Sequence, residues 1–485
     1  MPVMWVGLLF AMISLSTQFQ QTFLAPTHGM SVSGHSTPLL QVPGGQTTTD
    51  VFREAIIRCL KLGHYTKGGP YVLETLILYF LVEILPLKEV DIGIWVLVGS
   101  IVQVATHMGY HRDPIHFPGI SPFAAEMRRR VWAMIIQLDF SISTQMGLPR
   151  LIKEGQTDTA NPRNLADSDF DELTEDLPPS RPEQEVTPIL YTLAKLRILS
   201  VGIRVADLAT SPRPYSYDIV TELDKKIGQA QEALPSSMKW ESLASSLTLP
   251  PHVLMQRIWL EIFVQRLKIV LHKKFLASPR SQQQSYAYSR SACLAAAMKI
   301  LEFHHLVDEE TQLEGRLYHV RWRVSTACTH EFLLATSVLC LYLQVYNEGQ
   351  GDQHSGQQAL ETTQIERIRQ LLRVSQGIWL RLSAESTEAR KAAAALQYVL
   401  GDSTFGASDA ASSMPAATAP YFTGEFRVCI IITYQSPCAK NGGEKSRRLT
   451  HDRNDGFYAG ISFPEPRART DGRVVLAEIW FLFQQ

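Results

Sequence analysis

The sequence lacks an excess of either charge. Its 485 residues include 46 Lys and Arg against 47 Asp and Glu, so the formal net charge at pH 7 is −1. A domain that grips phosphate on its own usually carries a clear basic excess or a basic stripe. Neither is present, and the composition therefore argues against a free-standing nucleic-acid-binding domain.

Cysteine is scarce, and no two cysteines are separated by only two residues. A zinc knuckle or a dithiol redox pair needs such close spacing. The wide spacing within apolar runs instead predicts reduced core thiols and an intracellular protein. The six residues are Cys59, Cys293, Cys328, Cys340, Cys429 and Cys438.

The motifs of common enzyme sites are also missing. The sequence contains no G-x-S-x-G elbow, no phosphate-binding loop and no G-x-G-x-x-G fingerprint. THEFLL resembles half of a zinc-protease motif, but Leu334 occupies the place of its second histidine. His107 and His111 lie one helical turn apart, a spacing that can hold a metal. We favour instead a helix C-terminus, where histidine and arginine meet the negative end of the helix dipole. We predict no catalytic residue and no metal ligand, and a helical metabolic enzyme remains the competing class because active sites can form from scattered residues.

Alternating strand patterns are almost absent before residue 400, and helical periodicity dominates. The pattern predicts an all-α fold, with a long polar loop over 153–182. Thr49 or Asp50 is expected to cap one helix and Gly63 to stop it, while Ser121 and Pro122 begin another that ends before Gly147. Further helices are expected at about 183–208, 217–233, 252–277, 287–308, 315–347, 362–383 and 386–400.

Two apolar stretches allow a membrane alternative. Residues 1–21 resemble a signal peptide in length, but no Lys or Arg precedes the run and no cleavage motif follows it. Residues 92–110 carry no Asp, Glu, Lys or Arg over a length that could span a bilayer. Polar and glycine positions in both stretches favour helices of a soluble core. A membrane-associated protein therefore stays the second competing class.

The character of the chain changes near residue 400. Residues 401–420 form a low-complexity linker rich in Ala and Ser. Residues 421–485 combine short apolar pieces with a polar stretch, and they predict a poorly ordered tail outside the main fold. The expected organisation is a large helical domain over 1–400, the linker over 401–420 and the tail over 421–485.

Three consecutive arginines, Arg128 to Arg130, precede an apolar helical run that includes Asp139. Glu126 lies one helical turn before Arg130, in the better orientation for an ion pair. Three successive helical residues fan out over about 200°, so at least one guanidinium must face inward, where a charge needs a partner. Arg128 and Asp139 share a face but lie about 16 Å apart along the axis, too far to touch. We therefore predict a buried junction of ion pairs and hydrogen bonds, with partners drawn from Arg112, Asp113, Arg150 and Arg163. Trp132 is expected to pack in the core.

These residues occur in the stretch HMGYHRDP and the following SPFAAEMRRRVWAMIIQLDFSISTQMGLPRLI. Together they resemble the fungal-specific transcription factor domain, the regulatory middle region of fungal zinc-cluster transcription factors. The likeness covers roughly residues 1–400. Tyr110 stands where leucine is usual, and Leu148 where arginine is common. The matching positions, called here the signature residues, are Gly109, His111, Arg112, Asp113, Pro114, Arg129, Arg130, Trp132, Asp139, Gly147 and Pro149.

The resemblance implies an all-α, nuclear, effector-sensing part of a transcriptional regulator that controls RNA polymerase II genes of a metabolic pathway or gene cluster. The zinc ions and the DNA-binding residues of the family belong to an N-terminal six-cysteine module that this chain lacks. We therefore expect no cofactor and no DNA-binding residue here, with DNA reached only through a missing module or a partner. The expected partners are the transcription machinery or co-regulator proteins. A small-molecule effector and a homodimer are both compatible with the resemblance.

Overall fold

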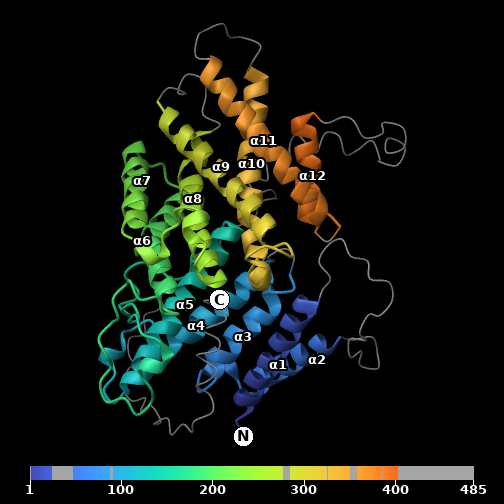
Figure 1. The fold of residues 1–485 in the computed structure, drawn as a ribbon. Coiled ribbons are helices and arrows are strands. Elements are labelled where there is room, and N and C mark those ends of the chain that lie inside the picture. Colours follow the sequence, from blue (N-terminus) through green and yellow to red (C-terminus); the bar gives the residue numbers. More distant parts are fainter. Residues whose placement is uncertain are drawn as a thin grey trace, which may run out of the picture.

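The chain folds into α-helices joined by short 3₁₀ turns and one long loop (Figure 1). The computed structural model describes residues 2–24, 47–87, 91–276, 285–324, 326–349, 358–384 and 386–401. No strand occurs in these ranges, which confirms the all-α class. The α-helices in them are α1 (Val3–Leu24), α2 (Thr48–Leu62), α3 (Val72–Ile84), α4 (Ile92–His107), α5 (Pro122–Met146), α6 (Leu190–Ala209), α7 (Tyr217–Glu232), α8 (Pro251–His272), α9 (Ala287–Glu310), α10 (Thr326–Gly349), α11 (Gln358–Leu382) and α12 (Thr387–Leu400).

Local sequence signals set several helix ends. Ser121 caps α5 by accepting a hydrogen bond from the Ala124 N–H, and Pro122 occupies the first helical turn, as predicted. Gly147 ends α5 in the left-handed region at φ 66°. The expected cap of α2 was misplaced: Thr47 is the N-cap, and Asp50 completes a capping box as its third residue.

Two expected helices differ from the structure. α6 begins at Leu190 rather than near residue 183, because Thr187 bonds back to the loop and Pro188 has no N–H to donate. The helix expected over 315–347 is instead a 3₁₀ segment, Tyr318–Arg323, followed by α10. The linker and the tail lie outside the described residues apart from Gly401, so that division of the chain remains a prediction.

Among the described residues, three large hydrophobic cores follow one another along the chain, and a small fourth cluster of Met127, Leu165 and Phe170 lies beside α5. The first lies among α1 to α5, the second among α5 to α8, and the third among α8 to α12. α5 and α8 each contribute to two cores and thereby join them. The Arg266 guanidinium on α8 also links α10 to α5. It lies 2.8 Å from the Glu331 carboxylate on α10 and 2.9 Å from the Thr144 hydroxyl on α5. α5, the helix that carries the arginines, therefore lies where two cores meet.

Candidate functional site

The signature begins where α4 ends. Gly109 adopts φ 75°, a left-handed conformation that disfavours any side chain. A Cβ there would also lie 3.0 Å from the Phe117 ring and 3.4 Å from the Arg128 guanidinium. The Tyr110 N–H then bonds back to the Ala105 carbonyl at 2.9 Å. Glycine at this position therefore closes the helix and lets the chain turn toward α5.

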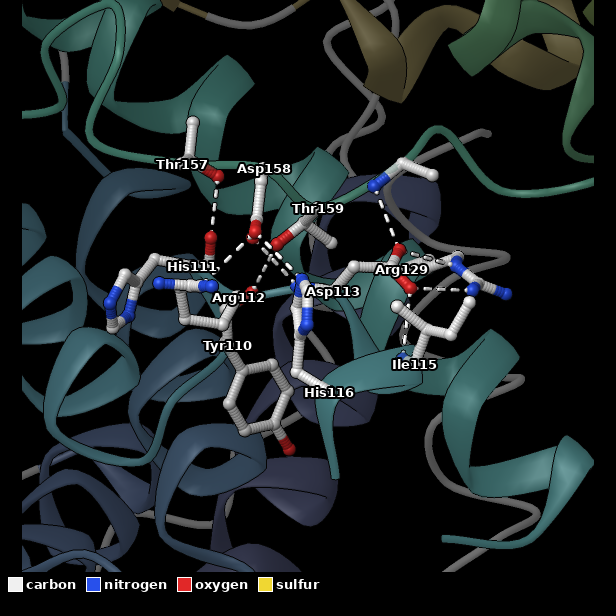
Figure 2. Close-up of polar contacts among 11 residues, drawn as sticks. Tyr110, His111, Arg112, Asp113, Ile115, His116, Arg129, Thr157, Asp158 and Thr159 are labelled. Atoms are coloured by element: carbon white, nitrogen blue, oxygen red, sulfur yellow. Dashed lines mark hydrogen bonds and ion pairs between the residues drawn. The ribbon is translucent and has the colours of Figure 1, made fainter. Parts of the chain in front are cut away.

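Asp113 is the centre of the turn (Figure 2). Its carboxylate receives two hydrogen bonds from Arg129 at 2.8 and 2.9 Å, and one each from the N–H groups of Ile115 and Ala160 at 3.0 and 2.9 Å. The hydrogen bonds from Arg129 hold the pKa of Asp113 well below its usual range. With 8% of its side chain exposed, this carboxylate fastens the turn to α5 and to the loop beyond it. Pro114 begins the short 3₁₀ turn Pro114–His116, which Asp113 caps.

The loop around residue 158 fastens the other side of the turn. The Asp158 carboxylate accepts the Asp113 N–H at 2.9 Å and lies 3.1 Å from Arg112 and 2.9 Å from His116 (Figure 2). The hydroxyls of Thr157 and Thr159 donate to the carbonyls of His111 and Tyr110. Residues 110–116 and 157–160 are therefore hydrogen-bonded along their length.

The three consecutive arginines take three different environments. Arg128 donates to the Met108 carbonyl at 2.9 Å and lies 4.3 Å above the Tyr110 ring, and burial lowers its pKa. Arg129 pairs with Asp113 as described. Arg130 is 1% exposed and bonds to the carboxylates of Glu126 at 3.4 Å and Asp167 at 2.6 Å. The expected i,i+4 ion pair between Glu126 and Arg130 is confirmed.

The Glu126 carboxylate is fully buried beside Arg130. Its Oε1 atom also accepts the Arg163 N–H at 3.0 Å, whereas no hydrogen-bond partner reaches its Oε2 atom. Burial raises the pKa of Glu126, against the opposing charge of Arg130. Arg163, a predicted partner of this region, directs its own guanidinium to the carbonyls of Leu177 and Pro178.

Asp139 is 1% exposed, but its partners differ from those expected. Its carboxylate accepts the N–H groups of Leu151 and Ile152 at 3.0 and 2.9 Å and lies 3.3 Å from the Ser143 hydroxyl. Arg150 instead forms a two-pronged pair with Asp207 on α6. Burial raises the pKa of Asp139 despite these hydrogen bonds. Asp139 therefore holds the backbone that follows Gly147 and Pro149.

The remaining signature side chains are aromatic or close to an aromatic ring. Trp132 is 2% exposed and donates from its indole nitrogen to the Thr157 hydroxyl at 2.8 Å. The His111 ring makes an edge contact with Trp132, with centroids 6.4 Å apart. Within the part of the chain that the structure describes, no three His, Cys, Asp or Glu residues are grouped so that they could hold a metal. The structure thus brings the signature together as a set of internal contacts.

Residues of the loop after α5 complete this site. Asn164 is 1% exposed, and its amide nitrogen reaches three carbonyls between residues 181 and 185 at 3.2 to 3.4 Å. Asp169 pairs with Arg181 in the same loop. Asn164 and Asp167 lie in the stretch TANPRNLADSDF, which resembles the P-x-N-x-x-D loop of the fungal-specific transcription factor domain through Pro162, Asn164 and Asp167. The pair of Asp169 with Arg181 had no such signal.

A second polar network, also missed, joins α7, α8 and α9. His272 lies 2.9 Å from the Ser289 hydroxyl and 3.2 Å from the Asp224 carboxylate. This is the residue set of a serine hydrolase. His272 and Ser289 are both 0% exposed, and the Tyr217 hydroxyl lies 2.8 Å from Ser289. A substrate therefore has no access to this hydroxyl, and the network joins helices instead.

The geometry defines an all-helical protein whose charged motif is an internal brace, by which we mean a set of largely buried ion pairs and hydrogen bonds that hold α5 to the turn before it and the loop after it. Residues 53–234 match the family described as the fungal specific transcription factor domain. A pyrrolocin cluster transcription factor, fsdR, of a fungal species (strain NRRL 50135) is 60% identical over 431 residues, which cover 87% of this chain and 56% of the relative. The Zn(2)-C6 fungal-type transcription factor mpsB of Macrophomina phaseolina is 41% identical over 399 residues, 82% of this chain and 52% of the relative.

The transcription factor cghF of Chaetomium globosum is 36% identical over 398 residues, which cover 82% of this chain and 67% of the relative. The chain belongs to the fungal-specific transcription factor domain family, as the resemblance implied. This is a family of transcription factors and not of enzymes. The chain spans about half the length of several curated relatives that it matches. No solved structure matches it significantly.

Proposed function

We propose that this chain is the regulatory part of a nuclear fungal transcription factor that controls a biosynthetic gene cluster. The identity with a relative named as a cluster transcription factor carries the proposal. DNA is reached through a separate zinc-cluster module or through a partner, and the output goes to the transcription machinery or to co-regulators. The inward-facing arginines support this division, because Arg129 and Arg130 already have carboxylate partners. A guanidinium that is committed in this way does not contact DNA phosphate.

A reporter assay tests the proposal. The whole chain is fused to a foreign DNA-binding domain and targeted to a reporter promoter in a filamentous fungus. The expected result is a reproducible change in reporter transcription relative to the DNA-binding domain alone. The same fusion with Arg130→Met should lose this effect, because Glu126 is left buried without its ion-pair partner. The matched control is Arg58→Met on α2, since 75% of the Arg58 side chain is exposed.

The proposal fails if the wild-type fusion is well expressed and leaves the reporter unchanged. Purified chain that turned over a substrate or carried a bound cofactor would favour an enzyme instead. Extraction that required detergent would favour a membrane protein. Among the described residues, one helical segment is compatible with a membrane protein. Val3–Gln20 of α1 is long and apolar enough to cross a bilayer, by length and composition alone.

We further propose that a small effector binds in the groove between α9 and α11. This groove has a volume of about 1140 Å³, and its walls carry Glu302 and His305 on one side and Glu366 and Arg367 on the other. The volume is that of a site for a small molecule. Glu302 and Arg367 are paired with each other across the groove, so an effector would contact other polar side chains of the lining, such as Gln370. Candidate metabolites of the cluster should raise the melting temperature of the wild-type chain, and Val374→Trp at the groove should abolish the shift. A shift that Val374→Trp leaves unchanged would exclude this groove.

A further inference from the structure

One hydroxyl group in the long loop between α5 and α6 makes no hydrogen bond. Residues 147–189 are all described, and they contain six serine and threonine side chains. Ser168 is exposed, and its hydroxyl has no partner among the described residues. The Ser168 hydroxyl is therefore available to a molecule from outside. The five hydroxyls that are hydrogen-bonded belong to Thr157, Thr159, Thr174, Ser180 and Thr187.

The neighbours of Ser168 are strongly acidic. The stretch that we call the acidic loop, residues 167–176, contains six carboxylates and no Lys, Arg or His. Asp169 and Asp171 follow the serine by one and three positions. Asp171, Glu175 and Asp176 are exposed. The surface around the Ser168 hydroxyl therefore attracts a cationic partner.

Two ion pairs hold the acidic loop on either side of Ser168. The Asp167 carboxylate lies 2.6 Å from the guanidinium of the buried Arg130 on α5. The Asp169 carboxylate accepts a hydrogen bond from Arg181 Nε at 2.7 Å. The long loop lies on the outside of the helix array in Figure 1. Ser168 is thus an accessible residue between the two contacts that tie this part of the loop down.

We propose that Ser168 is a phosphorylation site for an acid-directed serine/threonine kinase, and that the phosphate loosens the acidic loop from α5. A kinase of this class selects its substrates by charge, through a cationic groove that binds carboxylates near the serine. The Ser168 Oγ atom attacks the γ-phosphorus of ATP, and a new bond between oxygen and phosphorus forms. The bond from the γ-phosphorus to the bridging oxygen breaks, ADP leaves, and the hydroxyl proton passes to a base of the kinase.

The loosening follows from the charges beside the new phosphate. A phosphoserine carries a charge of about −1.5 to −2 at pH 7. At residue 168 it repels the carboxylates of Asp167 and Asp169 on either side. It also competes with Asp169 for Arg181, whose side chain is 39% exposed. Both effects weaken the contacts that hold the acidic loop.

Thr174 is the nearest alternative acceptor of a phosphate, and its contacts favour it less. Its hydroxyl donates to the Asp171 carboxylate at 3.1 Å and accepts the Asp171 N–H at 2.8 Å. Glu175 and Asp176 follow it, so its neighbours are as acidic as those of Ser168. Thr174→Ala is therefore a matched control for Ser168→Ala.

Phosphorylation of the purified full-length chain tests the proposal. The chain is incubated with ATP and recombinant casein kinase 2, an acid-directed kinase, and tandem mass spectrometry locates the phosphate. We expect phosphate on Ser168, lost in Ser168→Ala and retained in Thr174→Ala. Asp171→Asn keeps an acceptor oxygen but removes one charge. It should lower the initial rate of Ser168 phosphorylation by about fivefold, the effect of one close charge pair in water.

Hydrogen–deuterium exchange tests the effect of the phosphate on the loop. Backbone amides in residues 164–181 should exchange faster in the phosphorylated chain than in the unmodified chain, because local opening becomes easier. Amides of α11 provide the internal control and should exchange at the same rate in both. Unchanged exchange over 164–181 would contradict the loosening.

A synthetic peptide spanning residues 164–178 distinguishes two ways in which the phosphorylation test can fail. A peptide that is phosphorylated while the folded chain is not would show that the fold hides Ser168. Failure of both would show that the acidic neighbours do not direct the kinase to this serine. An Asp171→Asn variant phosphorylated as fast as the wild type would contradict the charge argument. Each of these results would overturn the proposal.

Discussion

Replacing Asp139 by alanine removes the acceptor that holds the chain after α5. In the folded chain this carboxylate receives the N–H groups of Leu151, which is partly buried, and of Ile152, which is buried. The variant leaves both N–H groups without a partner, at a cost of about 1–3 kcal/mol each. Relief of the buried charge offsets part of that cost, since burial raises the pKa of Asp139. We expect a loss of about 3 kcal/mol in the free energy of unfolding.

The assay is urea denaturation of the purified chain, followed by circular dichroism. The Asp139→Asn side chain has the same shape and keeps one acceptor oxygen. We therefore expect its free energy of unfolding to fall less than that of Asp139→Ala. Asp171→Ala is the control, because its carboxylate is on the exposed part of the loop. An Asp139→Ala variant within about 0.5 kcal/mol of the wild type, the range of ordinary surface changes, would refute the reasoning.

Three further predictions concern the same site. Asp113 has a lowered pKa, so its contribution to stability is complete above the ordinary aspartate pKa of about 3.9 and is lost as the pH falls from there toward the lowered value. Asp113→Asn should therefore reduce the fall in melting temperature at acid pH, measured between pH 2 and 7. A variant whose melting temperature falls as steeply as that of the wild type would contradict the assignment. Arg130→Met should cost about 3–5 kcal/mol by urea denaturation, and adding Glu126→Gln should recover part of it, because the unpaired buried charge is gone; a purely additive loss would exclude their pairing. Gly109→Ala should destabilise by more than about 1 kcal/mol at its positive φ, whereas Gly228→Ala inside α7, where a Cβ meets nothing within 4 Å, should stabilise by about 0.5–1 kcal/mol; equal effects in thermal unfolding would contradict the conformational argument.

Hydrophobic periodicity and residues that cap or end helices were enough to predict most of the helices. Ser121, Pro122 and Gly147 act through their own backbone conformations and nearest neighbours, so the bounds of α5 were readable without tertiary information. The start of α6 was not readable, because the bond between Thr187 and Asn164 links residues 23 positions apart. The interruption of the helix before α10 was not predicted either, because the 3₁₀ segment Tyr318–Arg323 contains no proline or glycine that would indicate it.

In the candidate site, too, the contacts within one helix could be predicted from the sequence, and the contacts with distant residues could not. The inward position of at least one arginine followed from helix geometry alone, and so did the ion pair of Arg130 with Glu126 one turn away. The partners of Asp139 did not follow, because backbone N–H groups have no sequence signature. Charged residues suggested Arg150 instead, whose actual partner, Asp207, lies 57 residues further along the chain.

The central claim is that the charged signature is an internal brace that positions the helices of a regulatory domain. A double-mutant cycle between Asp113→Ala and Arg129→Ala measures it most directly, with the free energy of unfolding as the readout. Because the pair forms two hydrogen bonds at 2.8 and 2.9 Å and is largely shielded from water, we predict a coupling free energy of about 1.5–3 kcal/mol. A coupling near zero, with both single variants as stable as the wild type, would show that these side chains are free in solvent and would contradict the account.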